Sequence, residues 1–302
     1  MDFDKIYTTL CAAVPGIKLL RDEDMKSHCS FRVGGPARLF VEAESERQLA
    51  AIVKALNELG AKSLVIGRGT NILVKDEGVN AVVIHMGESF SRVYVTGNTV
   101  HAEAGASLAA IASAALQHGL TGMEFAHGIP GSLGGALMMN AGAYGGEMAD
   151  IVEFVRYLDA DGNIRECEAG DCRFAYRHSR FEEEPCLILG ARLRLAPGNK
   201  EAIAARMKEL SEKRIASQPL DKPSAGSTFK RPATGYAAAM IDQCGLKGFT
   251  VGGAQVSEKH AGFVINAGDA TFEDITALMG QVQQRVYERF GVMLEPEVRI
   301  VG

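Results

Sequence analysis

Apolar residues recur along this chain with both helical and strand periods, which predicts a mixed α+β protein. Ser45 and Gln48 form a capping-box pattern, and apolar residues continue at helical spacing through residues 49–59. Two short β-branched runs, at residues 64–67 and 81–86, predict buried strands. Helix and strand signals therefore alternate from the N-terminal third onward.

The remaining elements follow from the same periods and from turn residues. Turns at residues 96–98 and 160–162 predict hairpins over residues 93–102 and 151–169. Helices are expected at residues 107–117, 200–215, 236–244 and 271–290. Strands are expected at residues 186–196, 253–256, 262–266 and 294–301.

The bulk composition is that of an ordinary globular protein. The chain has 302 residues, of which 47% are hydrophobic and 23% charged. This length exceeds what one small core needs, so more than one domain is expected, with a boundary near Pro197 and Gly198. A net charge of −5 provides no broad attraction to nucleic acid or to an anionic membrane surface, so neither is expected as a partner.

Cysteine usage and the N-terminus indicate the compartment. The six cysteines contain no C-x-x-C pair and no histidine cluster accompanies them, so no metal site is expected. Free thiols in a reducing compartment fit this pattern better than a disulfide framework. Asp2 and Asp4 stand where a secretory signal would be basic, and no apolar run approaches the length of a membrane span. We therefore expect a cytoplasmic protein.

One stretch, GIPGSLGGALMMNAGAYGG at residues 128–146, holds seven glycines among residues that must pack. A glycine inside a helix or strand costs roughly 0.5–1 kcal/mol relative to alanine, so the stretch needs a reason. Bare N–H groups that face outward bind anions, above all the phosphates of nucleotides and cofactors. The alternative is a tight turn packed against neighbouring backbone.

A second glycine-rich segment, GRGTN at residues 67–71, directly follows an expected strand. A strand that ends in Gly-x-Gly turns sharply and exposes N–H groups, which suits a pyrophosphate. The segment matches neither G-x-G-x-x-G nor G-x-x-x-x-G-K-[ST], so a Rossmann or P-loop site is disfavoured. A hairpin turn explains the pentapeptide equally well.

Three polar segments carry candidate chemistry. Arg177, within YRHS, offers a planar fork that suits a carboxylate, although surface arginines more often form ion pairs. Ser227 lies in SAGSTFKRP, where a hydroxyl stands close to two cations; the alternative is a solvated loop. Glu297 lies in LEPEVR, which by itself is equally typical of a surface turn.

In this order, GRGTN with ILV after it, GIPGSLGGAL, MNAGAYG, YR.S, GS.FK.P and LEPEVR resemble the UDP-N-acetylenolpyruvoylglucosamine reductases, the MurB family. The resemblance spans about residues 30–299. It implies an α+β protein whose FAD-binding fold is of the vanillyl-alcohol oxidase (PCMH) type, followed by a smaller C-terminal α+β substrate domain. It also implies FAD and NADPH as cofactors and a UDP-sugar with an enolpyruvyl ether as substrate.

The resemblance divides the chain into three expected ranges: residues 1–84 and 85–197, which hold FAD, and residues 198–302, which bind substrate. It implies that Arg177 faces the substrate carboxylate, that Ser227 donates a proton and that Glu297 is catalytic. Substrate contacts are implied for Tyr176, Lys230 and Arg299. Cofactor contacts are implied for Gly67, Arg68, Gly69, Thr70, Asn71, Gly128, Ile129, Gly131, Ser132, Gly135, Asn140, Gly142 and Ala143.

The chain resembles the shorter subtype of the family, because no insertion supplies an extra tyrosine loop over the substrate. Lys213, Arg214 and Gln218 are therefore only candidates for gripping the uridine diphosphate. Two other functions remain open at this point. One is an FAD oxidase of the same fold that passes electrons to oxygen, and the other is a nucleotide-binding module without turnover.

Overall fold

A computed structural model describes all residues from 1 to 302, and the chain folds into two compact units. Each unit is assembled from three segments of the chain, so the chain passes repeatedly from one unit to the other. The first unit comprises Met1–Arg21, Leu39–Arg68 and Ala81–Lys213; the second comprises Asp22–Arg38, Gly69–Asn80 and Arg214–Gly302.

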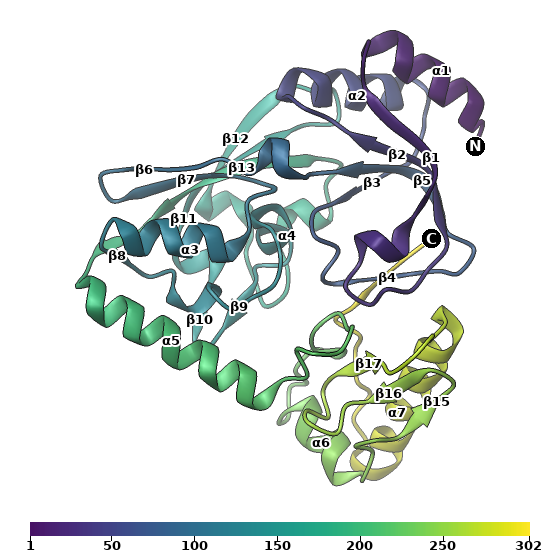
Figure 1. The fold of residues 1–302 in the computed structure, drawn as a ribbon, viewed down its shortest axis with the longest axis vertical. Helices are drawn as coiled ribbons and strands as arrows, with labels where there is room; N and C mark the ends of the chain where they lie inside the picture. The colour runs from purple at the N-terminus through teal and green to yellow at the C-terminus, as the bar shows by residue number, and fades with distance from the viewer. The chain divides into compact units, whose positions relative to one another are not determined.

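Helices and strands alternate along the whole chain (Figure 1). The helices are α1 (Phe3–Ala13), α2 (Glu46–Glu58), α3 (Leu108–Gln117), α4 (Leu133–Met138), α5 (Lys200–Ser217), α6 (Ala237–Gln243) and α7 (Phe272–Phe290). The strands are β1 (Lys18–Asp24), β2 (Pro36–Glu42), β3 (Ser63–Ile66), β4 (Ile72–Val74), β5 (Val79–His85), β6 (Val93–Thr96), β7 (Thr99–Glu103), β8 (Leu120–Thr121), β9 (Gly142–Ala143), β10 (Gly146–Glu147), β11 (Val152–Leu158), β12 (Ile164–Glu168), β13 (Leu187–Arg194), β14 (Ala196–Pro197), β15 (Thr250–Val251), β16 (Ala254–Val256), β17 (Val264–Asn266) and β18 (Arg299–Val301). Short 3₁₀ helices cover Met25–His28, Glu88–Phe90, Glu124–Ala126, Met148–Asp150, Ala169–Cys172 and Arg180–Glu182.

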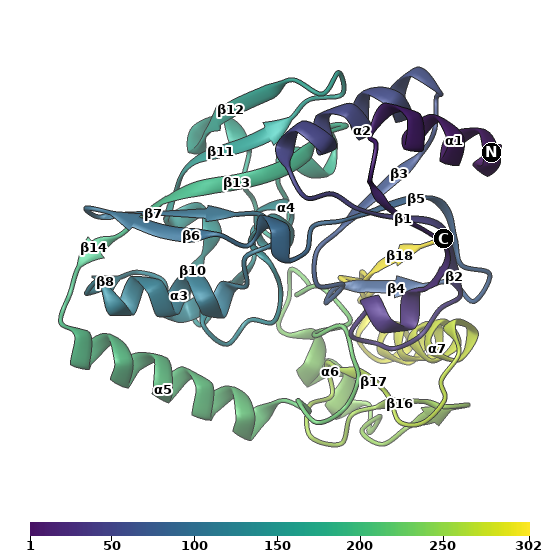
Figure 2. The ribbon, with the colours of Figure 1, turned by 45° about the horizontal axis from the view of Figure 1, so that its top comes forward.

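A four-stranded sheet in the order β1-β2-β5-β3 has most of its residues in the first unit. Strands β3 and β5 run parallel, with Ser63 opposite Val82. Helices α1 and α2 lie side by side next to this sheet (Figures 1 and 2). Buried residues of both helices, among them Leu10 and Leu49, belong to the same apolar core as Val41 of β2, so the helices cover the sheet.

The other part of the first unit is a five-stranded antiparallel sheet in the order β12-β11-β13-β7-β6. Helix α3 contacts β6 and β7, and α4 contacts β7 and β13 (Figure 2). A single apolar core extends from Ile6 to Met207 and so joins both sheets of this unit. The glycine-rich stretch is therefore held against a continuous, well-packed core.

The second unit is smaller and also α+β. Strands β15, β16 and β17 form an antiparallel sheet on which α7 packs (Figure 1). Thr271 caps α7 in a capping box with Asp274, and Gly291 ends the helix with φ at +67°. At the end of the chain β18 pairs in parallel with β4, with Arg299 opposite Ile72.

Most of the predicted elements are confirmed, including both hairpins and the helices near residues 107–117, 200–215, 236–244 and 271–290. Ser45 caps α2 as predicted, but Gln48 accepts from the N–H of Glu44 rather than from Ser45, so the reciprocal capping bond is wrong. The strand predicted at residues 294–301 is shorter than expected. Pro296 has no N–H to donate, and only Arg299–Val301 forms a strand.

The three consecutive ranges 1–84, 85–197 and 198–302 stay a prediction about domains. The two compact units interleave along the chain, and α5 crosses from the first unit to the second between Lys213 and Arg214. The structure contains no helix that combines the length and the hydropathy needed to cross a membrane.

Candidate functional site

The two glycine-rich segments meet inside the first unit. Strand β3 ends at Ile66, and Gly67 follows it against the buried side chain of Ser132. A β-carbon built on Gly67 would overlap Oγ of Ser132 and lie 3.1 Å from its Cβ. Only glycine therefore allows β3 to end at this point.

Ser132 starts helix α4, but the first N–H groups of this helix are not bare. The N–H of Leu133 donates to the carbonyl of Ala106 at 2.9 Å, and that of Gly134 donates to Ala104 at 2.8 Å. The expectation of outward-facing N–H groups throughout residues 128–146 is therefore wrong here, because α4 is laid against the segment that leads into α3.

Several glycines of this stretch are explained by close packing of backbone. In the β9–β10 hairpin, a β-carbon on Gly142 would lie 2.7 Å from the carbonyl oxygen of Gly146. One on Gly146 would lie 2.7 Å from the ring of Phe125. Gly135 differs, because the nearest atom to its β-carbon position, Oγ of Ser132, is 4.0 Å away. Gly145 is more open still, since no atom lies within 4 Å of its β-carbon position, so open space is found at Gly135 and Gly145 rather than along the whole stretch.

The pentapeptide at residues 67–71 is divided between the units, with Gly67 and Arg68 in the first and the rest in the second. Gly69 has φ at +60°, and a side chain there would overlap the carbonyl of His28, so a tight turn explains this glycine. Asn71 reaches the catalytic candidate: its Nδ2 donates to the carbonyl of Glu297 at 3.1 Å.

Arg177 occupies the tip of a tight turn in the first unit. Ala175 and His178 each donate an N–H to the carbonyl of the other at 3.1 Å, which leaves Tyr176 and Arg177 between them. Arg177 has φ at +54°, in the left-handed region. That conformation costs a residue with a side chain about 1–2 kcal/mol, and such strain is concentrated at functional positions.

Two contacts locate the guanidinium of Arg177. Its Nη2 donates to the carbonyl of Gly142 in β9 at 3.3 Å. Its Cζ lies 5.1 Å from the ring centroid of Tyr176, within the range of a cation–π interaction. The structure thus brings together three predicted site residues, Tyr176, Arg177 and Gly142.

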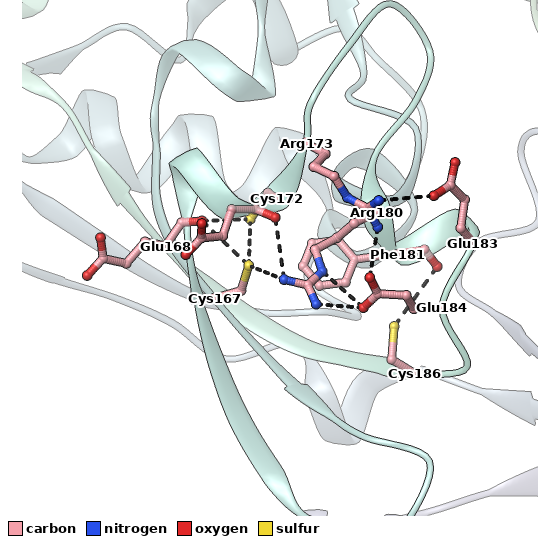
Figure 3. Close-up of polar contacts among 10 residues, drawn as sticks. Cys167, Glu168, Cys172, Arg173, Arg180, Phe181, Glu183, Glu184 and Cys186 are labelled. Carbon is pink, nitrogen blue, oxygen red and sulfur yellow. Dashed lines mark hydrogen bonds and ion pairs between the residues drawn. The ribbon is translucent and has the colours of Figure 1, made fainter.

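Directly after this turn, Arg180 anchors the chain to neighbouring residues (Figure 3). Its Nη2 donates to Glu184 at 2.7 Å, and its Nη1 lies 3.5 Å from Sγ of Cys167. The hydrogen bond from Arg180 lowers the pKa of the Glu184 carboxyl below its usual value. The Cys172 thiol, whose pKa is raised by burial, donates to Cys167 at 3.4 Å.

All six cysteines are free thiols.

Ser227 and Glu297 come together in the second unit through their neighbours. Thr228 is fully buried and accepts at its carbonyl from the N–H of Glu297 at 2.8 Å. Its own N–H donates to Gly262 at 2.8 Å, and its Oγ1 accepts from the N–H of Val264 at 2.9 Å. Ser227 itself is exposed, so its hydroxyl is accessible to a ligand.

The substrate candidates Lys230 and Arg299 lie on the same framework as Ser227 and Glu297. The N–H of Lys230 donates to the carbonyl of Glu295 at 2.8 Å, and its Nζ forms an ion pair with the Glu295 carboxylate at 2.5 Å. The N–H of Arg299 donates to the carbonyl of Asn71 at 3.0 Å. The sequence did not predict these contacts. The only local sign of them is Thr228 within GSTFK, a polar residue that the structure shows to be buried.

The candidates for gripping a uridine diphosphate lie at the end of α5 and just beyond it. Lys213 forms an ion pair with Glu209 at 2.6 Å. Oε1 of Gln218 is buried and has no hydrogen-bond partner. A cavity of about 420 Å³ lies within the first unit beside α5, lined among others by Tyr144, Asn199 and Arg206, and none of the predicted site residues lines it.

Comparison with protein families divides the chain in two. A model for an FAD binding domain matches residues 37–168, and a model for the C-terminal domain of UDP-N-acetylenolpyruvoylglucosamine reductase matches residues 218–301. The solved structure of UDP-N-acetylenolpyruvylglucosamine reductase from Thermus caldophilus is similar, with a TM-score of 0.82 and 33% identity over 95% of this chain and 99% of that one. The predicted fold, an FAD-binding fold of the vanillyl-alcohol oxidase type with a C-terminal α+β region, is confirmed.

Curated relatives are similar over nearly the whole chain. The UDP-N-acetylenolpyruvoylglucosamine reductase of Clostridioides difficile (strain 630) is 46% identical over all of this chain and 99% of its own length. That of Caldanaerobacter subterraneus subsp. tengcongensis is 48% identical over 94% of each chain. The chain therefore belongs to the family of the UDP-N-acetylenolpyruvoylglucosamine reductases.

Proposed function

We propose that this chain uses NADPH to reduce the enolpyruvyl ether of UDP-N-acetylglucosamine enolpyruvate to UDP-N-acetylmuramate, a precursor of peptidoglycan. Membership of its family makes it an FAD-dependent oxidoreductase. The observation that supports the substrate most strongly is the 46% identity to a reductase of this name over all 302 residues. The six free thiols support a reducing, cytoplasmic location.

The residues around Gly67 and Ser132 suit a flavin nucleotide. Gly67 packs against Ser132, and the open space beside Gly135 provides a surface on which a flat ring or phosphates can lie. When bound, FAD would supply the hydride that the reaction needs. The proposed cofactor-binding residues are Gly67, Arg68, Gly69, Thr70, Asn71, Gly128, Ile129, Gly131, Ser132, Gly135, Asn140, Gly142 and Ala143.

The proposed role of Arg177 follows from where charge develops. Hydride addition to the terminal carbon of the enolpyruvyl double bond moves negative charge onto the adjacent carbon and into the carboxylate. A guanidinium has five N–H donors in a fork that matches a carboxylate. Arg177, held on a strained turn beside Tyr176, would bind the carboxylate as this charge builds.

Ser227 and Glu297 would complete the reaction. The Ser227 hydroxyl would donate its proton to the carbon that carries the negative charge, and the cation of Lys230 would stabilise the alkoxide that remains. Glu297, held through Thr228 and Asn71, would act on the developing enolate. Tyr176, Lys230 and Arg299 are the proposed substrate-binding residues.

The proposal is tested by following NADPH oxidation by the purified, FAD-loaded protein with and without the enolpyruvyl UDP-sugar. Strict dependence of turnover on the sugar is expected, together with one product lactyl ether per NADPH consumed. Oxygen-dependent NADPH oxidation that ignores the sugar would favour an FAD oxidase instead. A protein that stays colourless after incubation with FAD would favour a nucleotide-binding module without turnover.

A further inference from the structure

Asn140 is the most unusual residue of the glycine-rich stretch, because it is a fully buried polar side chain in the left-handed region, with φ at +44°. Both ends of its amide are occupied by main chain. Its Nδ2 donates to the carbonyl of Ala175 at 3.1 Å, and its Oδ1 accepts from the N–H of Ala149 at 2.9 Å. A buried amide satisfied in this way specifies one arrangement of the segments that it joins.

Ser179 repeats this arrangement from the other side of the same turn. It is also fully buried, and its Oγ donates to the carbonyl of Met138 at 2.7 Å. Met138 is the last residue of α4, two positions before Asn140. The turn that carries Arg177 is therefore attached at both ends to one short segment, with Ala175 bonded to Asn140 and Ser179 to Met138.

The guanidinium of Arg177 lies over the same segment, through its bond to the carbonyl of Gly142. Its backbone is in a conformation that a residue with a side chain rarely adopts, so surrounding contacts must hold it there. The bonds at Ala175 and Ser179 are the side-chain contacts that flank it on either side.

We infer that Asn140 and Ser179 are positioning residues that hold Arg177 in its strained conformation against α4 and β9, an inference that rests on the proposed function of Arg177. It gives the side chain of Asn140 this task, so the contact with FAD proposed for Asn140 falls to its main chain. The glycine-rich stretch then does two things: Gly135 leaves room for the cofactor, and Asn140 positions an arginine that lies more than thirty residues further along the chain.

The two roles of Asn140 predict different losses. Asn140→Asp keeps the shape and the acceptor for Ala149 but replaces the donor to Ala175 with an oxygen. Ser179→Ala removes only the donor to Met138. If both residues position Arg177, either variant lowers kcat for sugar reduction by at least about tenfold, as small misplacements of a catalytic group do. The dissociation constant for FAD then stays near its wild-type value.

Double variants with Arg177→Ala distinguish a positioning role from a general loss of packing around the turn. In an Arg177→Ala background, adding Ser179→Ala is expected to change kcat little further, because the group that it positions is gone. Ser113→Ala is the matched control: the Ser113 hydroxyl donates to the carbonyl of Ala109 in α3, far from this turn in sequence. Melting temperatures of all variants show whether they fold, and Ser179→Ala decides the matter if Asn140→Asp does not.

A rise in the FAD dissociation constant for Asn140→Asp, with unchanged kcat once loaded, would overturn the inference in favour of a cofactor contact. The inference would also be overturned if adding Ser179→Ala to Arg177→Ala lowered kcat by the same factor as Ser179→Ala does in the wild-type protein. Near-wild-type turnover by Arg177→Ala alone would instead overturn the proposed function of Arg177, and with it this inference.

Discussion

Gly67 and Ser132, 65 residues apart, lie so close that a β-carbon on Gly67 would overlap the serine hydroxyl. The end of β3 and the start of α4 are thereby fixed to one another. This contact explains why Gly67 matters for the shape of the protein. A second substitution, at Ser132, should therefore restore part of the stability that a substitution at Gly67 loses.

Gly67→Ala is expected to destabilise the protein by about 1–3 kcal/mol, the usual cost of overpacking, and to weaken FAD binding. Removing the Ser132 hydroxyl as well leaves a contact of 3.1 Å to Cβ, so Gly67→Ala with Ser132→Ala should recover part of the stability. Thermal unfolding of both variants measures this. Gly170→Ala, at a glycine with open space around it, is the control. No recovery in the double variant would contradict the account.

Arg177→Gly and Arg177→Ala should lose turnover alike but differ in stability. Glycine adopts φ at +54° without penalty, whereas alanine pays about 1 kcal/mol or more for it. The glycine variant is therefore expected to melt at the higher temperature, although glycine is the more flexible residue when unfolded. If alanine were equally stable, the turn would relax in the variants and the strain argument would be wrong.

Ser227→Ala is expected to lower sugar-dependent turnover by roughly 10²–10⁴-fold, the usual contribution of general acid catalysis. Reduction of the flavin by NADPH needs no such proton and should survive. Rapid-mixing absorbance measurements separate the two half-reactions. Ser224→Ala, in the same loop, serves as the control and should turn over at a near-normal rate. Normal turnover by Ser227→Ala with normal substrate binding would rule out the proton-donor role.

His260 makes stability depend on pH near neutrality. Burial, with a smaller contribution from the Lys247 cation, lowers the pKa of its imidazole below 6.5. The unfolded chain therefore takes up a proton that the folded protein resists, so this contribution is complete above about pH 6.5 and is lost as the pH falls below it. His260→Asn keeps an acceptor for the N–H of Gly262 and removes the titration.

Melting temperatures from about pH 7.5 down to pH 5.5 should therefore fall less steeply for His260→Asn than for the wild-type protein. His260 accepts from the N–H of Gly262, and the carbonyl of Gly262 accepts from the N–H of Thr228, so hydrogen bonds link His260 to the residue next to Ser227. Parallel pH profiles for the two proteins would show that His260 does not titrate as described.

Local pattern predicted the elements well and the site only in part. Apolar periodicity located α2 and α7, a capping residue and a following glycine located α3, and composition located α5, whereas α1 and β2 went unpredicted. Motifs indicated Arg177, Ser227 and Glu297, but the residues whose hydrogen bonds hold their segments in place lie far away in the sequence. Nothing in the sequence indicates that Asn71 bonds to the carbonyl of Glu297, 226 residues away.

Backbone conformation was the other gap in the prediction. Tertiary hydrogen bonds hold Arg177 and Asn140 at a left-handed φ. Neither residue is a glycine, so the sequence does not indicate this conformation. The sequence also contains no sign that the N–H groups of Leu133 and Gly134 donate to the carbonyls of Ala106 and Ala104. Such contacts depend on the packed core rather than on neighbours in sequence.

In the proposed reaction, electrons pass from the reduced flavin to the enolpyruvyl sugar. The most direct test is to reduce the bound flavin with NADPH in the absence of oxygen and then add the UDP-sugar. Rapid return of the oxidised flavin absorbance is expected, with formation of the lactyl ether and a large slowing in Arg177→Ala. A flavin that stays reduced in the presence of the sugar, yet is reoxidised promptly by air, would contradict the proposed reaction.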